Sequence, residues 1–469
     1  MHHLYRAIAN PLTLLAVTLW VALAPVSVAC ADVTRVVVKS SGPMGVFKGR
    51  QYIWVTATME GTVERGGGER GQYRVPIVLI YPDRTPNGFG FVDIVNSAIF
   101  AAYKEGEAPG GKRSVYYFGD IVFSDYLRRE GFTYLAVQWA RMVTDVLGAD
   151  YGVIEDGRDG YAIIKDAARF LRHPVTLEGA VPFRPQAVGR VIGFGQSQTA
   201  FLLRELVRSG QNRDKDGALT FDGLLAGVGG GLCKILNNEA TPRPEPGPTN
   251  PRFETNVPCG EPLPEDGKFI SIQTQSDIDG FRGYLARHQT PSYRQYELAG
   301  VAHVPPDMID TRLLGAARQN PVSFRPVFKA MLHNLVEWIV SGTAPPDSMY
   351  IEGTVDSEGK VNFATDADGN VKGGLRLPHM PTVLRNGERA GAPLGVYGGL
   401  DPDYLKPLNL AAWLGGTFAP FSDQEIAARY PSTADYVQLV RNAAASLLAD
   451  RCILKEDYDA YIQAAPWWR

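Results

Sequence analysis

One pentapeptide, Gly195-Gln-Ser197-Gln-Thr199, limits more than any other feature what this chain can fold into. A short apolar stretch (188–194) precedes it, and a segment with apolar side chains at helical spacing follows it directly. A serine between a strand and a helix, with a small residue two positions before it, has the layout of a nucleophile elbow. The serine hydroxyl then projects from the sheet, and the first N–H groups of the helix point to the same place. A serine that only caps a helix is the alternative interpretation of the pentapeptide alone.

The chain is long enough for two or three structural units, or for one elaborated α/β domain. It has 469 residues, 45% hydrophobic content and a net charge of -3, which are ordinary values for a globular protein. This near-neutral charge does not predict a nucleic acid or an anionic membrane as a partner.

Residues 1–31 are expected to be a secretory signal peptide that is not part of the fold. Arg6 precedes a mostly apolar stretch (14–28), and Ala29-Cys-Ala31 has the small-x-small pattern of a cleavage site before Asp32. A membrane anchor, or a lipid anchor on Cys30, is the alternative, but the apolar stretch is short for a span. No later segment is long and apolar enough to cross a bilayer. We therefore expect a secreted or periplasmic mature chain without a membrane span.

Cysteine usage fits this expectation, because an oxidising compartment permits disulfides. Cys233 and Cys259 flank a Pro-rich insertion (about 230–265) that has little means of building its own core. We expect these two residues to form a disulfide and Cys452 to remain free. No pair of Cys or His residues has the spacing of metal ligands, so no metal site is predicted.

Predicted strands alternate with predicted helices along much of the chain. The pattern predicts an α/β fold with a mostly parallel sheet, helices on both faces, and a site at the carboxyl ends of the strands. The core is expected to span residues 32–346, and residues 347–469 should add hairpins and helices packed on it. The expected strands are 33–39, 51–58, 75–81, 89–95, 132–139, 188–194, 224–228, 269–273 and 293–298. The expected helices include 161–171, 327–340, 423–429 and 433–450.

A serine nucleophile needs a base, and the base needs an orienting acid. His303 is the candidate base because it lies in a turn of small residues directly after the strand at 293–298. Asp277 is the preferred acid and Asp279 the alternative, since both follow the strand at 269–273; an ordinary turn role is the other interpretation of both.

Acyl transfer also needs donors for the oxyanion. One donor is expected to be the backbone N–H of Gln198, the residue after the nucleophile. The other is expected in the loop after the strand at 89–95, at Asn96 or Ser97.

Several longer motifs share a pattern with a known group. They are Gly193-Phe-Gly-Gln-Ser197, Thr274-Gln-Ser-Asp277, Glu297-Leu-Ala-Gly-Val-Ala-His303, Gly342-Thr-Ala-Pro-Pro346 and Gly373-Gly-Leu-Arg-Leu-Pro378. On these motifs the chain resembles the secreted bacterial "alpha/beta hydrolase domain" proteins, a branch of the α/β-hydrolase superfamily. The resemblance implies an α/β-hydrolase fold and a serine hydrolase with Ser197 as nucleophile and His303 as base. The group more usually has Ser and Gly at positions 195 and 199, so we expect Thr199 to crowd the elbow.

The residues and the resemblance together predict an exported serine hydrolase that cleaves small-molecule or polymeric carboxylic esters through an acyl-enzyme, without a cofactor. An amidase, peptidase or lactonase would use the same three residues. A catalytically inactive α/β-hydrolase fold that serves as a binding protein is the alternative from another class. The sequence does not predict the oligomeric state.

Overall fold

The computed structural model describes residues 30–468, apart from 66–67, 85, 97–121, 124, 141–152, 155–156, 215, 235, 237–255, 260–264, 317 and 404–408. Residues 1–29 of the expected signal peptide, the candidate donor Ser97 and most of the Pro-rich insertion therefore lie outside the described residues.

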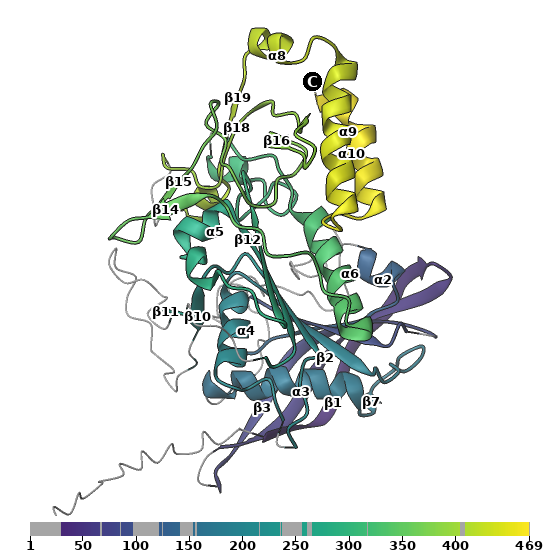
Figure 1. The fold of residues 1–469 in the computed structure, drawn as a ribbon. Coiled ribbons are helices and arrows are strands. Elements are labelled where there is room, and N and C mark those ends of the chain that lie inside the picture. Colours follow the sequence, from purple (N-terminus) through teal and green to yellow (C-terminus); the bar gives the residue numbers. More distant parts are fainter. Residues whose placement is uncertain are drawn as a thin grey trace, which may run out of the picture.

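A large mixed sheet runs through the molecule (Figure 1). Its strand order is β13-β12-β9-β8-β4-β5-β3-β2-β1-β7, and β6 pairs with β3. The strands are β1 (Cys30–Phe47), β2 (Arg50–Glu64), β3 (Arg70–Pro82), β4 (Phe89–Ile94), β5 (Thr133–Val137), β6 (Val153–Ile154), β7 (Leu177–Glu178), β8 (Arg190–Gln196), β9 (Gly223–Gly227), β12 (Lys268–Thr274) and β13 (Tyr293–Leu298).

Strands β5, β4, β8, β9, β12 and β13 are parallel neighbours, which confirms the predicted mostly parallel sheet. The long strands β1, β2 and β3 form antiparallel hairpins at the other side, and β3 pairs antiparallel with β5. Parallel strands covered on both faces are short continuous apolar runs. All six residues of β4 are buried accordingly.

Helices cover both faces of the parallel half. On one face Val92 and Ile94 of β4 pack with α3 (Gly160–Arg172) and α4 (Gln198–Arg208). On the other face Phe91 packs with α2 (Tyr126–Arg129) and α6 (Arg325–Ser341). The alternation of side chains along β4 thus divides the core into two layers.

The described residues of the C-terminal part form small hairpins and four helices. The strand pairs are β14 (Gly353–Val355) with β15 (Val361–Phe363), β16 (Thr382–Val383) with β17 (Arg389–Ala390), and β18 (Gly395–Gly398) with β19 (Thr417–Pro420). The helices are α7 (Leu410–Leu414), α8 (Asp423–Arg429), α9 (Thr433–Ala449) and α10 (Lys455–Trp468). Helices α9 and α10 lie side by side at one end of the molecule (Figure 1). None of the described helices is both long and apolar enough to cross a membrane.

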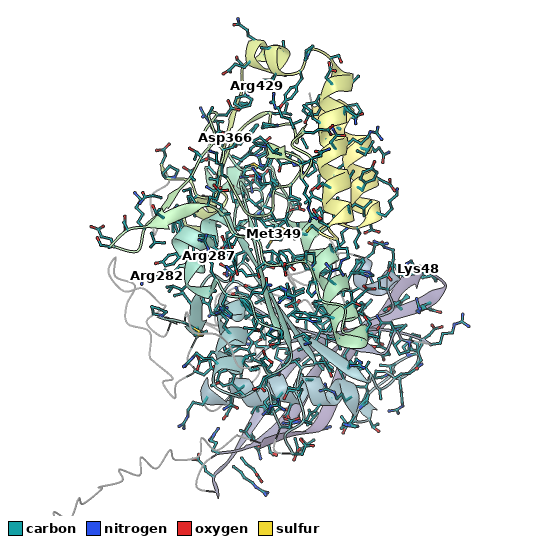
Figure 2. All side chains as sticks on the ribbon, viewed as in Figure 1. Lys48, Arg282, Arg287, Met349, Asp366 and Arg429 are labelled. Atoms are coloured by element: carbon teal, nitrogen blue, oxygen red, sulfur yellow. A yellow bond between two sulfur atoms is a disulfide. The ribbon has the colours of Figure 1, made fainter. Side chains whose placement is uncertain are left out.

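The C-terminal part joins the core along the free edge of β13. The N–H of Met349, labelled in Figure 2, donates to the carbonyl of Gln295 at 3.0 Å, and the N–H of Glu297 donates to the carbonyl of Met349 at 2.9 Å. The N–H of Ala299 then donates to the carbonyl of Leu375 at 3.1 Å. These bonds cover the edge of the sheet with chain from beyond residue 346.

The predicted disulfide between Cys233 and Cys259 is present, with a Cα–Cα distance of 5.4 Å. It joins β10 (Leu232–Lys234) to β11 (Asn256–Pro258), which form a short antiparallel ribbon. Cys452 is free and buried, and this burial raises the pKa of its thiol to about 12.

Candidate active site

Ser197 occupies a strained turn between β8 and α4. Its backbone angles are φ 56° and ψ -116°, a conformation that residues other than glycine rarely adopt. The approach of the helix explains why glycine stands at 195, since a Cβ there would lie 2.5 Å from the carbonyl oxygen of Thr199. Beyond the end of β8, the N–H of Ser197 donates to the carbonyl of Gly227 at 2.8 Å. The turn therefore has the geometry that a nucleophile elbow requires.

Thr199 fits the turn through its hydroxyl group. The side chain is fully buried, its Oγ1 accepts from the N–H of Gln196 at 2.8 Å, and it donates to the carbonyl of Gln196 at 3.0 Å. Thr199 was expected to crowd the elbow. In the structure its hydroxyl instead bonds to the backbone N–H and carbonyl of Gln196 at the end of β8.

His303 lies between Ser197 and Asp277. Its Nε2 is 3.1 Å from Ser197 Oγ, and its Nδ1 is 2.6 Å from Asp277 Oδ1. The imidazole reaches this position from the small-residue turn after β13, as its sequence position suggested. His303 is 5% exposed and Asp277 is fully buried, so the hydrogen bond between them is shielded from solvent.

The structure brings Asp277, and not Asp279, to the histidine. Asp277 lies in the first turn of the short helix α5 (Gln275–Gly280), directly after β12. Its Oδ2 accepts from the N–H of Thr274 at 2.6 Å and from the Thr274 hydroxyl at 2.7 Å. Asp279 lies on the same helix but accepts instead from the N–H of Val361 in the C-terminal part, at 3.3 Å.

No role was predicted for Thr274 from its motif, although the sequence carries a signal for one. A Thr-x-x-Asp spacing directly after a strand is typical of a helix N-terminus at which the two side chains bond to each other's backbone. Thr274 is the N-cap of α5, and Asp277 is the third residue of that helix.

Elements of the core and of the C-terminal part surround the histidine. The ring of Phe281 lies 5.3 Å from the His303 ring, between centroids. The N–H of Val304, next to His303, donates to the carbonyl of Leu414 in α7 at 3.0 Å. Val304, Leu414 and Trp413 form a small apolar cluster with Phe281 packed against it. The loop that carries the imidazole thus contacts both the core, through Phe281, and the C-terminal part, through Leu414 and Trp413.

Two of the three candidate oxyanion donors lie in the described part of the chain. Gln198 is the first residue of α4, directly after Ser197. In the β4–β8 register the last pair is Ile94 with Gly195, and Asn96 follows two residues after the end of β4. Asn96 is 6% exposed. Ser97, the third candidate, is outside the described residues.

Two partly buried histidines have different surroundings. His288 stacks on Tyr293 with the ring centroids 4.1 Å apart, and His379 lies beside Tyr461 at 6.0 Å. Burial lowers the pKa of both imidazoles to about 4, so both are neutral at pH 7. Within the described ranges no three His, Cys, Asp or Glu side chains are grouped as metal ligands.

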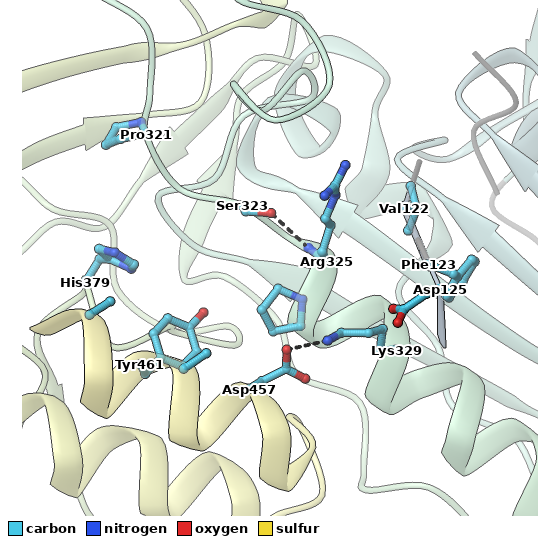
Figure 3. A pocket seen from close by; sticks show the side chains of 13 residues that line it. Val122, Phe123, Asp125, Pro321, Ser323, Arg325, Lys329, His379, Asp457 and Tyr461 are labelled. Carbon is cyan, nitrogen blue, oxygen red and sulfur yellow. Dashed lines mark hydrogen bonds and ion pairs between the residues drawn. The ribbon is translucent and has the colours of Figure 1, made fainter. Parts of the chain in front are cut away.

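Two cavities among the described residues have linings that do not include Ser197, Asp277 or His303. The larger, of about 510 Å³, lies between α6, α10 and the residues Val122, Phe123 and Asp125 (Figure 3). Across it Lys329 Nζ is 2.6 Å from Asp457 Oδ1. The smaller, of about 410 Å³, is lined in part by Asp279 and Trp413.

Comparisons with known proteins agree with this architecture. A family model described as "Alpha/beta hydrolase domain" matches residues 122–463. Solved structures to which the chain is distantly similar include the rice cell wall degrading esterase LipA from Xanthomonas oryzae, at 10% identity over 42% of this chain and 50% of that one, with a TM-score of 0.26. Lipase A from Candida antarctica in its closed state is similar at 10% identity over 42% of each chain, with a TM-score of 0.25. The chain spans about half the length of these structures or less. No curated protein matches the chain.

Proposed function

The chain belongs to the alpha/beta hydrolase domain family, and from this premise we propose that it is a serine hydrolase that cleaves carboxylic esters through an acyl-enzyme. The observation that carries the proposal is the hydrogen-bonded series from Ser197 to His303, at 3.1 Å, and from His303 to Asp277, at 2.6 Å. A nucleophile, a base and an orienting acid need this connectivity to act together.

In the proposed mechanism Ser197 Oγ attacks the carbonyl carbon of the ester while His303 Nε2 accepts the hydroxyl proton. The tetrahedral intermediate collapses, the bond from carbon to the alcohol oxygen breaks, and Nε2 returns the proton to the departing alkoxide. Asp277 Oδ1 accepts the Nδ1–H bond throughout, which fixes the tautomer and stabilises the imidazolium. Water then attacks the acyl-enzyme in the same way and releases the acid and free Ser197.

The negative oxygen of the intermediate would be stabilised from two directions. The backbone N–H of Gln198 begins α4, where helix N–H groups and the positive end of the dipole point outward. The position of Asn96 just after β4, which is the parallel neighbour of β8, supports a second donor at the end of β4.

A fluorophosphonate probe tests the proposal directly. We expect wild-type protein to be labelled and to hydrolyse short-chain aryl esters, whereas Ser197→Ala and His303→Ala lose both properties, because the first removes the nucleophile and the second its base. His288→Ala, a histidine outside the series, serves as the control and should still be labelled. A folded wild-type protein that neither reacts with the probe nor cleaves any ester would favour the inactive binding protein. Amides and lactones with the same acyl group would separate the other hydrolase alternatives.

The choice of acid has its own test. Asp277→Asn is expected to lower kcat by about 10⁴-fold, because an amide cannot hold the imidazole in the required tautomer. Asp279→Asn is the matched control on the same helix, and its kcat should stay within about twofold of wild type, since Asp279 bonds to Val361 and not to His303. The reverse ranking of these two variants would assign the acid to Asp279.

We also propose that the mature chain is secreted or periplasmic. The disulfide between Cys233 and Cys259 supports this proposal, since structural disulfides persist in oxidising compartments. Fractionation of the host cells, with detection of the processed N-terminus at Asp32, would test it.

A further inference from the structure

We propose that Thr274 is a positioning residue for the acid of this site, because its hydroxyl and N–H groups fix one oxygen of Asp277 so that the other faces His303. The inference rests on the proposed function, since Thr274 can act only through Asp277. It adds Thr274 to the proposed site of Ser197, Asp277 and His303.

Both carboxylate oxygens of Asp277 have defined hydrogen-bond partners. Asp277 Oδ2 accepts from the N–H of Thr274 at 2.6 Å and from its Oγ1 at 2.7 Å, while Oδ1 lies 2.6 Å from His303 Nδ1. A carboxylate turns readily about its last side-chain bond, because that torsion has no sharp minima. Two donors on one oxygen remove this freedom and point the remaining oxygen at the imidazole.

Ser276 extends the arrangement by one further hydroxyl group. Its Oγ is 2.9 Å from Thr274 Oγ1. Because the Thr274 proton is directed to Asp277, the Ser276 hydroxyl donates to Thr274. Thr274, Ser276 and Asp277 are all fully buried, so water cannot replace a missing donor. Hydrogen bonds in such a buried series strengthen one another.

The same pattern occurs elsewhere in this chain without a histidine, which provides a matched control. At the start of α9, Asp435 Oδ2 accepts from the N–H of Ser432 at 3.0 Å and from its Oγ at 2.7 Å. Ser432→Ala therefore removes an equivalent hydroxyl group from a helix start that is remote in sequence from the elbow and exposed to solvent.

The first test compares Thr274→Val, which removes the hydroxyl and keeps the shape, with Thr274→Ser, which keeps the hydroxyl. We expect Thr274→Val to lower kcat about tenfold with KM within about twofold, because the bond lost is made to a buried charge and not to substrate. Thr274→Ser should restore kcat to within about twofold, and Ser432→Ala should leave kcat unchanged. Ser276→Ala, expected to lower kcat about threefold, keeps the inference testable if Thr274→Val fails to fold.

A double-mutant cycle with Asp277→Asn then separates positioning from a general structural effect. The measured quantity is the rate of labelling by the fluorophosphonate probe. If Thr274 acts through Asp277, Thr274→Val should change this rate less than twofold in the Asp277→Asn background.

A tenfold loss in both backgrounds, or a folded Thr274→Val protein with wild-type kcat, would overturn the inference. These outcomes differ from a failure of the proposed function, in which wild-type protein itself is neither labelled nor active.

Discussion

Gly195 and Thr199 hold Ser197 in its strained conformation by different means. Gly195 leaves room for the helix, since any Cβ would collide with the carbonyl oxygen of Thr199. Thr199 contributes a hydroxyl that bonds to both backbone groups of Gln196. A strained residue persists when its surroundings determine its conformation. Thr199 is therefore part of what stabilises this turn.

We predict that Thr199→Val destabilises the protein by about 1–3 kcal/mol, because the buried N–H of Gln196 loses its acceptor. The kcat for a short-chain ester should fall with it, as the turn relaxes and displaces Ser197. Urea unfolding and steady-state kinetics measure the two effects. Thr199→Ser keeps the hydroxyl and should resemble wild type in both. A Val variant as stable and active as wild type would show that the hydroxyl contributes nothing.

At the scale of elements, strong local signals predicted the fold well. The strand at 293–298 and the helix at 423–429 match β13 and α8 at both ends. Hairpins were predicted beyond residue 346, and the turn at 356–359 does join β14 to β15, whereas the turn at 366–369 is flanked by a single bridge between Thr365 and Val371. Strands β1 and β2 are longer than predicted, because pairing along a hairpin extends past the apolar run of either strand.

Two C-terminal helices were not predicted. The apolar face of α10 consists largely of Tyr461 and Ala465, which give weak periodicity, and Pro466 is more typical of a helix end. Helix α7 has only five residues, too few for a periodic pattern, and its Leu414 accepts a hydrogen bond from the loop of His303. The contact of Thr274 with Asp277 was not predicted, although its local signal is strong. Only the fold brings Asp277 to His303 and so gives this contact a place in the site.

The ribbon of β10 and β11 provides a test at this scale. The disulfide between Cys233 and Cys259 has a sequence separation of 26 residues, and closing a loop of this size stabilises a protein by about 3 kcal/mol in the chain-entropy model. We expect the double variant Cys233→Ala/Cys259→Ala to lose about this amount in urea unfolding. Dithiothreitol should lower the stability of wild type to a similar degree and leave the double variant unchanged. Equal stability of the two proteins without reductant would contradict the prediction.

At the scale of the whole molecule, the contacts that join the C-terminal part to the core include the backbone bonds at the β13 edge and a group of charges around Glu456. Glu456 of α10 accepts from Arg129 at 2.7 and 3.0 Å and from Lys329 at 2.8 Å. Arg129 is the last residue of α2 and Lys329 belongs to α6, so one carboxylate connects three helices. The bonds from Arg129 lower the pKa of Glu456 to about 2, with Lys329 acting in the same direction.

The pH dependence of this connection follows from the direction of that shift. A carboxylate whose pKa is lower in the folded state stabilises the fold above its unfolded pKa, which is 4.5 for Glu456, and loses that contribution as the pH falls through about 2. Glu456→Gln should therefore lower stability at pH 7. Because the Glu456 side chain is 36% exposed, solvent screens the pairs and the expected loss is only about 1 kcal/mol.

The difference between wild type and Glu456→Gln should remain constant from pH 7 to about 5, narrow below pH 4.5, and vanish near pH 2. Thermal unfolding of both proteins across this range measures it. Asp459→Asn is the control, because Asp459 also lies on α10 but pairs with Lys455 of the same helix at an exposed position. If Asp459→Asn reproduced the effect, the loss would reflect the charge of α10 in general. If the difference persisted at pH 2, the contribution of Glu456 would come from packing, and the docking of α10 would not depend on the charges of Arg129 and Lys329.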